Sequence, residues 1–258
     1  MKITIITACW NSISTINDAI ESVKRQKLPD GVELEHLIID GGSDDGTERL
    51  ATLSEKDRGM YDALNKGIRM ASGEVVGLLN ADDVLAEDDT IAKIAAAFAD
   101  PTIDGTYGDV RFVRADVRCT TTTSDCNSIR KSPPVRYCSG KWFRPWMFRF
   151  GIQTAHPSTF FRKECFAKWG DYSLDYGMYG DFELLCRFIW KNKAKMKYLP
   201  ICTTVMRMGG ASTAGWRSNV EINREDLRAL RAHGIWSCLP LIHLKYLFKI
   251  WGFVFKRN

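Results

Sequence analysis

The residues best suited to chemistry are two adjacent carboxylates, Asp82 and Asp83, which follow a short apolar run at residues 75–79. A run of this kind, preceded by glycine, predicts a buried strand of a parallel sheet. Ligands of open α/β sheets bind where such strands end, and hard divalent cations prefer carboxylate oxygens. Because two carboxylates at this edge repel each other unless a cation intervenes, the stretch indicates a metal site.

A second acidic pair, Asp88-Asp89, offers a structural alternative for this region. These residues can cap a helix predicted over residues 90–98, while the earlier pair lines the cleft. A Gly-rich loop, GGSDDGT at residues 41–47, follows the second predicted strand. It allows close backbone approach but matches neither G-x-G-x-x-G nor the G-K-[ST] of a phosphate loop. A dehydrogenase or a P-loop enzyme is therefore not expected, and the loop alone is also consistent with a purely structural turn.

Three further polar side chains have both a functional and a structural interpretation. Asp181 follows YGMYG and precedes an apolar helical stretch, so it can cap that helix or face a cleft. His156 precedes proline in a polar loop, where a histidine can be structural or bind a ligand. Lys66 lies beside the apolar face of a predicted helix and could reach a phosphate or remain solvated.

The elements that must position these residues alternate between strands and helices. Strand, helix and strand in this order imply parallel pairing through a right-handed crossover. The aromatic and Arg-rich residues 141–150 could cover the cleft, stack sugar rings or touch lipid, and residues 124–140 are expected to be a loop. The predicted strands cover residues 2–8, 34–40, 75–79, 105–113, 117–123, 159–161, 195–199 and 203–208, and the predicted helices cover residues 16–26, 47–53, 57–73, 90–98, 182–190 and 216–233.

Charge is distributed unevenly along the 258 residues, which suit one sizeable domain or a domain with an appendage. Residues 1–100 carry a net charge of −9, residues 101–215 carry +9 and residues 216–258 carry +5. An acidic first part fits a metal site, and a basic remainder fits phosphates or an anionic membrane. Nucleic acid is not an expected partner, because no basic stripe with interleaved aromatics occurs early in the chain. The eight cysteines form no C-x-x-C pair, and no signal peptide is evident, so free thiols and a cytoplasmic setting are expected.

Taken together, these stretches resemble the family 2 glycosyltransferases, which have the GT-A fold, over residues 2–212. CWN resembles the family's aromatic-Asn turn, IIDGGSDDGT its nucleotide signature, LNADD its D-x-D region, and HPSTFFRKECF with GDFELLCRF the region of the catalytic base. DRGMYDALNKGI and GGAS are similar to bacterial exopolysaccharide transferases of the colanic-acid type. The resemblance implies an α/β, Rossmann-like, mostly parallel sheet flanked by helices. It assigns residues 1–215 to a glycosyltransferase domain, followed by C-terminal amphipathic helices at residues 216–258.

The resemblance also implies an inverting transfer of a sugar from a nucleotide-diphosphate sugar to a hydroxyl of a saccharide acceptor. A UDP-sugar is the donor expected first, and the acceptor is expected to be lipid-linked. Asp181 would be the catalytic base. Asn80 and Gly41 depart from the family's pattern by standing where it has aspartates, so Asp82, with Asp83, would bind Mg²⁺ or Mn²⁺. The expected donor-binding residues are Thr7, Asn11, Asp40, Asp45, Lys66, Asn80 and His156.

Two other functions remain open at this point, a sugar-phosphate nucleotidyltransferase and a non-catalytic nucleotide-binding protein. The former family opens with a Gly-rich, Arg-containing loop, which ACWN at residues 8–11 does not match. At the other end of the chain, residues 239–255 are apolar but interrupted or flanked by Lys245, Lys249 and Lys256. The run is too short and charged for a membrane span, and it predicts a helix lying in the interface of the inner membrane face, with packing onto the domain as the alternative.

Overall fold

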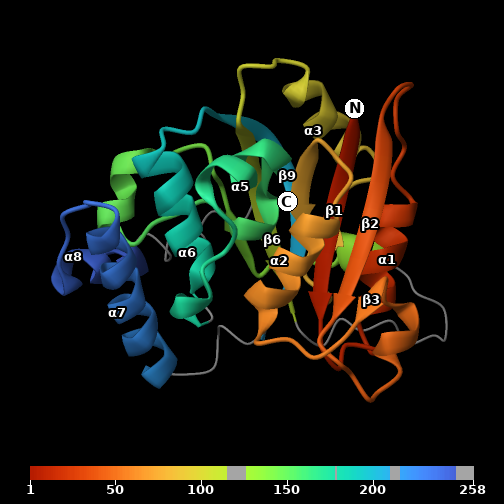
Figure 1. Ribbon diagram of the computed structural model, residues 1–258, viewed down its shortest axis with the longest axis horizontal. Helices are drawn as coiled ribbons and strands as arrows, with labels where there is room; N and C mark the ends of the chain where they lie inside the picture. The colour runs from red at the N-terminus through yellow and green to blue at the C-terminus, as the bar shows by residue number, and fades with distance from the viewer. Residues whose placement is uncertain (115–125, 178, 210–215, 248–258) are drawn as a thin grey trace.

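The computed structural model describes residues 1–114, 126–177, 179–209 and 216–247. Within these residues the chain forms one nine-stranded sheet with helices on both faces (Figure 1). The strands are β1 (Lys2–Cys9), β2 (Glu33–Asp40), β3 (Leu53–Ser54), β4 (Val75–Leu78), β5 (Val84–Leu85), β6 (Gly105–Val113), β7 (Arg136–Cys138), β8 (Thr159–Arg162) and β9 (Met196–Arg207). They are ordered β3-β2-β1-β4-β8-β6-β9-β5, and β7 pairs with β6.

The sheet is mostly parallel, as the alternation of strands and helices predicts. β3, β2, β1 and β4 run in one direction, and β6 and β9 are parallel to each other. β8 lies antiparallel between β4 and β6, and β5 and β7 pair antiparallel with β9 and β6. The α/β class predicted from the sequence is therefore confirmed.

Helices cover both faces of this sheet. The α-helices are α1 (Ile16–Lys24), α2 (Met60–Met70), α3 (Thr90–Phe98), α4 (Cys126–Lys131), α5 (Lys163–Trp169), α6 (Gly180–Leu185), α7 (Trp216–Ala232) and α8 (Leu239–His243). The 3₁₀ turns are η1 (Thr47–Leu50), η2 (Pro145–Phe150), η3 (His156–Ser158) and η4 (Leu174–Tyr176), and the π-helical segment η5 (Cys186–Lys191) continues α6.

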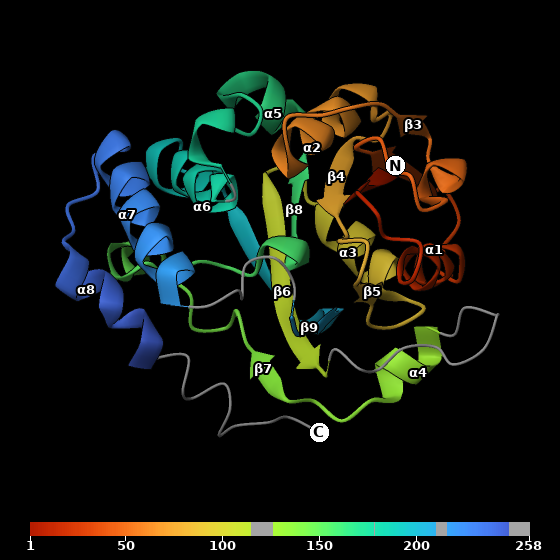
Figure 2. The ribbon, with the colours of Figure 1, turned by 90° about the horizontal axis from the view of Figure 1, so that it is seen from below.

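Side chains alternate along the strands between two apolar layers. Ile3 and Ile5 of β1 pack with α1 and α3 on one face, whereas Ile6 packs with α2 on the other. Figure 2 shows α2 and α5 on one side of β4 and β8, with α1 and α3 on the opposite side. Only glycine fits at position 77 in β4, because a Cβ on Gly77 would lie 2.0 Å from the ring of Phe160. The central strands are thus buried on both faces, as their apolar runs indicate.

Residues 124–140, expected to be a loop, contain α4 and β7, which corrects that prediction. β7 is only three residues long, so its pattern carries little periodicity. A long-range contact holds the segment, because the buried Asp109 carboxylate accepts hydrogen bonds from Tyr137 (2.6 Å), Ser139 (3.0 Å) and Tyr198 (2.9 Å).

The two strands predicted near the end of the sheet, residues 195–199 and 203–208, are one continuous strand, β9. Pro200 does not end this strand because it lies in an irregularity of the pairing, between the registers Tyr107 to Tyr198 and Asp109 to Cys202. Proline is tolerated at such irregular positions because no ladder hydrogen bond is required there. The strand predicted over residues 117–123 lies outside the described residues.

The predicted capping of α3 by its acidic pair is also wrong. Asp89 occupies the N-cap position without a side-chain hydrogen bond to the helix. Asp88 instead pairs with Arg25 at 3.2 Å. Gln26, which follows α1, accepts a hydrogen bond from the backbone N–H of Ile91 at 3.0 Å and so satisfies one donor in the first turn of α3. This long-range cap is not visible in the local sequence.

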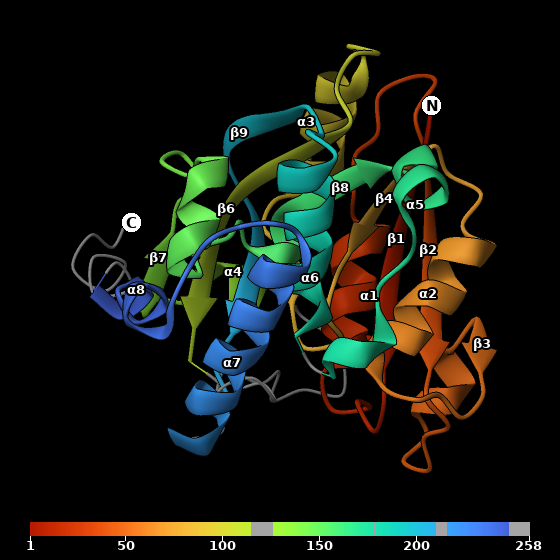
Figure 3. The same cartoon turned by 60° about the vertical axis from the view of Figure 1, so that its left-hand side comes forward.

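α7 and α8 lie together at one end of the molecule, beside α6 (Figure 3). Ile242 of α8 is fully buried, and Lys245 is buried with its Nζ 2.7 Å from Asp226 Oδ2 of α7. The predicted exposed stripe of lysines is therefore wrong at Lys245, whereas Lys249 and Lys256 lie outside the described residues. No helix in the described part of the chain has the length and apolar character required to cross a bilayer.

Candidate active site

Polar loops converge at the edge of the sheet where β1, β2 and β4 end. Cys9, the last residue of β1, pairs with Asp40, the last residue of β2, and Ile6 pairs with Leu78 at the end of β4. Because β8 runs in the opposite direction to β4, the segment that precedes β8 and contains His156 meets the same edge. α2 begins at this edge too, since it returns antiparallel to the strands. Most of the residues predicted from the sequence to bind substrate therefore lie at this one edge of the sheet.

The loops after β1 and β2 are hydrogen-bonded into one surface. Asn11 has a left-handed backbone, with φ of 47°, which asparagine tolerates well. Its N–H donates to Ser43 Oγ at 2.8 Å, and its Oδ1 accepts from the Asp44 N–H at 3.2 Å. Asp45 Oδ2 accepts from the Ile13 N–H at 3.0 Å. Asn11 and Asp45, both expected to bind the donor, thus shape the surface on which a nucleotide can lie.

Asp40 is enclosed beneath this surface. Its Oδ2 accepts from the N–H groups of Gly42 (3.1 Å) and Ser43 (2.9 Å) and from Ser54 Oγ (2.6 Å). Burial opposes ionisation of this carboxyl, but the hydrogen bonds from Ser43 and Ser54 outweigh it and lower the pKa of Asp40. The carboxylate is fully buried and therefore organises the Gly-rich loop from below.

The two adjacent aspartates at the end of β4 have different environments. Asp83 is buried, and its oxygens accept from Asn80 Nδ2 at 2.7 Å and from the Arg207 N–H at 3.1 Å. Asp82 is only half-buried. Burial raises the pKa of Asp82, and burial together with the charge of Asp82 raises the pKa of Asp83 well above its usual range. A cation near Asp82 would favour the ionised form of both carboxyls.

These carboxylates fit a Mg²⁺ or Mn²⁺ ion whose coordination is completed by a substrate. Within the described residues, no three His, Cys, Asp or Glu side chains come together as a metal site. Mg²⁺ is commonly held by one or two carboxylates together with substrate phosphates and water. Asp82 would be the main protein ligand, because both oxygens of Asp83 are already hydrogen-bonded.

Asp181 lies in the first turn of α6, one residue inside the helix. The N-cap position belongs to Tyr179, so the structural role considered for Asp181, that of a cap, is wrong. Its Oδ1 accepts from Tyr61 OH at 3.3 Å, and its Oδ2 accepts from Gln153 Nε2 at 2.9 Å. A half-buried carboxylate with these neutral partners retains lone pairs that can accept a proton.

A family model described as Glycosyl transferase family 2 matches residues 4–167, more than half of the chain. The chain belongs to this family. The matched residues include the loops after β1, β2 and β4 as well as α2, whereas Asp181 lies beyond them. The family resemblance drawn from the sequence motifs is confirmed.

This family 2 glycosyltransferase is 27% identical over 239 residues to a PGL/p-HBAD biosynthesis glycosyltransferase of Mycobacterium bovis, which covers 88% of the chain and 82% of that relative. Among solved structures, TarS of S. aureus has a TM-score of 0.62 at 15% identity, covering 98% of this chain and 44% of TarS. The mannosyltransferase PcManGT of Pyrobaculum calidifontis, solved with GDP-Man and Mn²⁺, has a TM-score of 0.61 at 21% identity, covering 98% and 72% of the two chains. The glycosyltransferase therefore has the predicted GT-A fold.

Three of the predicted donor-binding side chains are engaged within the glycosyltransferase itself. Lys66 Nζ lies 2.9 Å from Glu55 Oε1, so it can reach a phosphate only by leaving that partner. His156 Nε2 is 2.6 Å from Tyr172 OH, and burial lowers the pKa of His156, which favours the neutral ring. Thr7 is fully buried, with its hydroxyl 3.0 Å from a histidine of β2. These interactions favour a role for the three side chains in supporting the site over direct contact with the donor.

Sequence reasoning missed the residues that brace the acidic loop and the Asp181 carboxylate. Arg207, at the end of β9, forms an ion pair with Asp18 of α1 at 2.6 Å and donates a hydrogen bond to the Asp82 carbonyl. Tyr61 lies inside the motif DRGMYDALNKGI, which was noted only for its resemblance to the family. Its place in that motif, beside Asp62, was the available signal, whereas nothing local marks Arg207 or Gln153.

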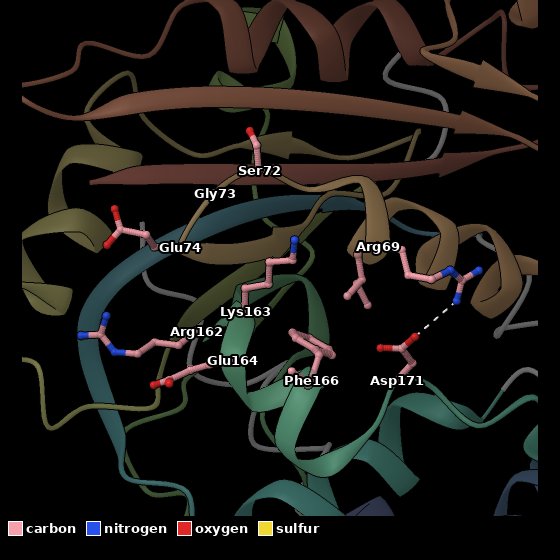
Figure 4. A pocket seen from close by; sticks show the side chains of 11 residues that line it. Arg69, Ser72, Gly73, Glu74, Arg162, Lys163, Glu164, Phe166 and Asp171 are labelled. Carbon is pink, nitrogen blue, oxygen red and sulfur yellow. Dashed lines mark hydrogen bonds and ion pairs between the residues drawn. The ribbon is translucent and has the colours of Figure 1, made fainter.

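A hollow with a volume of about 610 Å³ lies at the opposite edge of the sheet, where β4 begins. Among the side chains that line it, Arg69 points toward Asp171 (Figure 4). Arg69 bonds to Asp171 at 3.3 Å, Arg162 donates to three backbone carbonyls, and Lys163 donates to the Ala71 carbonyl. The cations of this hollow are thus committed within the chain, and the candidate active site remains at the other edge.

Proposed function

We propose that this glycosyltransferase moves a sugar, with inversion, from a nucleotide-diphosphate sugar to a hydroxyl of a saccharide acceptor. The observation that carries this proposal is the Asp181 carboxylate, which is half-buried and oriented by one hydrogen-bond donor on each oxygen. A general base needs an accessible lone pair in a fixed direction. Asp181 meets that requirement beside the segment before β8, which reaches the same sheet edge as the acidic loop of β4.

In the proposed reaction the acceptor oxygen forms a bond to the anomeric carbon while the bond from that carbon to the diphosphate breaks. The bonding electron pair leaves with the nucleoside diphosphate, and the acceptor's hydroxyl proton passes to Asp181. Attack opposite the leaving group inverts the anomeric configuration. Asp82 would hold a Mg²⁺ or Mn²⁺ ion, which would neutralise the charge that develops on the diphosphate.

For the donor, we propose that the nucleoside lies on the surface formed by the loops after β1 and β2, with a UDP-sugar as the first candidate. Trp10 supports this, because its side chain is 68% exposed beside Asn11 and can stack on a base. A fragment of TarS was solved with UDP-GlcNAc, and PcManGT was solved with GDP-Man. Both donors therefore belong in a binding screen.

For the acceptor, we propose a lipid-linked saccharide used in polysaccharide synthesis, met at the cytoplasmic face of the inner membrane. Exposed aromatic and aliphatic side chains near the C-terminus support this location, namely Trp236 (69%) and Leu247 (58%). The segment of Trp236 joins η2, since Ser237 Oγ donates to the Arg149 carbonyl at 2.5 Å. Tryptophan beside basic residues is typical of surfaces that contact anionic lipid.

The function is tested by screening UDP-GlcNAc, UDP-glucose and GDP-mannose with Mn²⁺ for a rise in melting temperature, because a ligand of the native state stabilises it. The best donor is then incubated with lipid-linked saccharides, and the new glycosidic bond is assigned by NMR. The proposal predicts a β-linked product from an α-linked donor. Retention of the α configuration contradicts the inverting mechanism, and absence of any donor-dependent stabilisation contradicts nucleotide-sugar binding.

A further inference from the structure

Two side chains from distant parts of the chain hold the Asp181 carboxylate. Tyr61, in the first turn of α2, donates to Oδ1 at 3.3 Å, and its hydroxyl oxygen accepts from the Asp181 backbone N–H at 3.1 Å. Gln153 Nε2 donates to Oδ2 at 2.9 Å. Because each carboxylate oxygen has one donor and the two donors come from different elements, the plane of the carboxylate is fixed.

The tyrosine that holds Asp181 is itself held rigidly. Tyr61 is 3% exposed and stacks on Tyr172, with ring centroids 5.2 Å apart and an interplanar angle of 19°. Asn65, one turn further along α2, bonds to both the backbone N–H and the carbonyl of Tyr172. A Cβ on Gly180 would lie 3.1 Å from the Tyr61 ring and from the Ser173 carbonyl oxygen, so glycine leaves the ring room where α6 begins. Tyr61 can therefore keep its hydroxyl in one place.

Gln153, which holds the other oxygen of Asp181, uses only part of its own hydrogen-bonding capacity. Gln153 Oε1 is enclosed by protein, and the structure shows no hydrogen-bond partner for it among the described residues. A buried acceptor without a partner reduces stability. The orientation of the Gln153 amide is thus set by its bond to Asp181. An unpaired buried oxygen of this kind is typical of functional sites, where the position of a side chain is kept at a cost in local stability.

We infer that Tyr61 and Gln153 are positioning residues that orient Asp181 toward the acceptor hydroxyl, an inference that rests on the proposed role of Asp181 as the base. One lone pair of each carboxylate oxygen is occupied by a fixed donor, which leaves the remaining lone pairs in defined directions. Burial and the nearby Asp181 charge raise the pKa of Tyr61 well above 10, so its hydroxyl keeps the proton it donates. Small errors in the placement of a base are costly to rate.

The test removes each donor with little change of shape, in the native protein and in the Asp181→Asn background. Tyr61→Phe and Gln153→Leu are compared by release of nucleoside diphosphate in Mn²⁺, in the presence of a lipid-linked saccharide acceptor. The donor is UDP-GlcNAc or GDP-mannose, whichever raises the melting temperature more. Each variant is expected to lower kcat about 10- to 100-fold and to leave donor Kd within about twofold. In the Asp181→Asn background neither change lowers kcat further, because a positioning residue acts only through the base.

A matched control is Tyr107→Phe, which removes the hydroxyl of another buried tyrosine, in β6, and is expected to leave kcat unchanged. If Tyr61→Phe does not fold, Gly180→Ala is used, since its Cβ displaces the same ring, and the same loss of kcat is expected. Unchanged kcat in the single variants, or an equal loss in both backgrounds, overturns the positioning role. Unchanged release in Asp181→Asn alone is a different result, which contradicts the proposed function instead.

Discussion

Although Asp82 and Asp83 are adjacent in the chain, only Asp82 has a carboxylate that a ligand can reach. We expect Asp82→Asn to lower turnover about 10²- to 10³-fold, since it removes the charge that would hold a cation at the diphosphate. The rise in melting temperature caused by donor and Mn²⁺ together should shrink as well. Asp30→Asn is the matched control, because Asp30 is exposed in the turn before β2, away from the loops of the candidate site. Native metal dependence in Asp82→Asn would contradict this assignment.

A second prediction at the scale of single residues concerns Glu35 of β2. Burial opposes its ionisation, but hydrogen bonds from Ser72 and Thr4 outweigh it and lower the pKa of Glu35 to about 2. A carboxyl with a lowered folded-state pKa stabilises the protein above its unfolded pKa of 4.5, and this stabilisation is lost as the pH falls toward 2. We expect a contribution of about 3 kcal/mol at neutral pH.

Urea unfolding at pH 7 and pH 3 measures this contribution. Glu35→Gln should lower the free energy of unfolding at pH 7 and lose part of the difference from the native protein at pH 3. Glu33→Gln, at an exposed position of the same strand, serves as the control and should change little at either pH. An equal deficit for Glu35→Gln at both pH values would show that ionisation of Glu35 is not the cause.

At the scale of elements, the ion pair of Asp18 and Arg207 joins α1, the end of β9 and the acidic loop. Both side chains are at least 95% buried, so loss of one partner leaves an uncompensated charge. We expect Asp18→Asn to cost about 3–5 kcal/mol in the free energy of unfolding. Asp89→Asn breaks the exposed pair with Lys93 and should cost about 0.5 kcal/mol or less. Similar costs for the two variants in urea unfolding would contradict the bracing role of the buried pair.

The strand and helix pattern was predictable because apolar periodicity and local turn residues determine most of it. The sequence pattern predicts β6 and α3 to the residue and the end of β2 at Asp40, whereas the end of β1 lies one residue later than predicted, at Cys9. Elements held by distant contacts were not predictable. β7 depends on the Asp109 carboxylate, and the start of α3 is capped by Gln26 from another helix.

The residues of the candidate site were likewise predictable only in part. Asp82 was predicted because carboxylates that follow a buried strand are an informative residue type, whereas the role of Asp181 as a base was implied by the family resemblance. The roles of Tyr61, Gln153 and Arg207 were not predicted, since each acts through a hydrogen bond to a residue far away in the chain. Lys66, expected to reach a phosphate, is paired with Glu55, a contact that depends on how α2 packs.

At the scale of the whole molecule, charge is uneven along the chain, and several large apolar side chains are exposed near α8 and η2. The first 100 residues are acidic, whereas the segment near α8 and η2 exposes Trp236, Leu247, Trp142 and Trp146. The domain boundary at residue 215 stays a prediction. A truncation after residue 234 would also remove the buried Ile242, so substitutions give a cleaner test of membrane contact than truncation does.

We expect the native protein to float with anionic liposomes and a Trp236→Ser/Leu247→Ser double variant to float about 10-fold less, because two large side chains no longer enter the interface. Met70→Ser, at an exposed apolar position on α2, is the control and should float like the native protein. Equal flotation of the native protein and the double variant would contradict membrane contact through this surface.

The central claim is that Asp181 is the base of a glycosyl transfer, and its most direct test is the rate of nucleoside diphosphate release by Asp181→Asn. Asparagine keeps the shape of the side chain and its contact with Tyr61 but does not accept a proton from a hydroxyl at neutral pH. With the donor and acceptor that the native protein uses, we predict that kcat falls about 10²- to 10⁴-fold while donor affinity and melting temperature stay close to native. A variant that folds, binds the donor and turns over at the native rate would contradict the account.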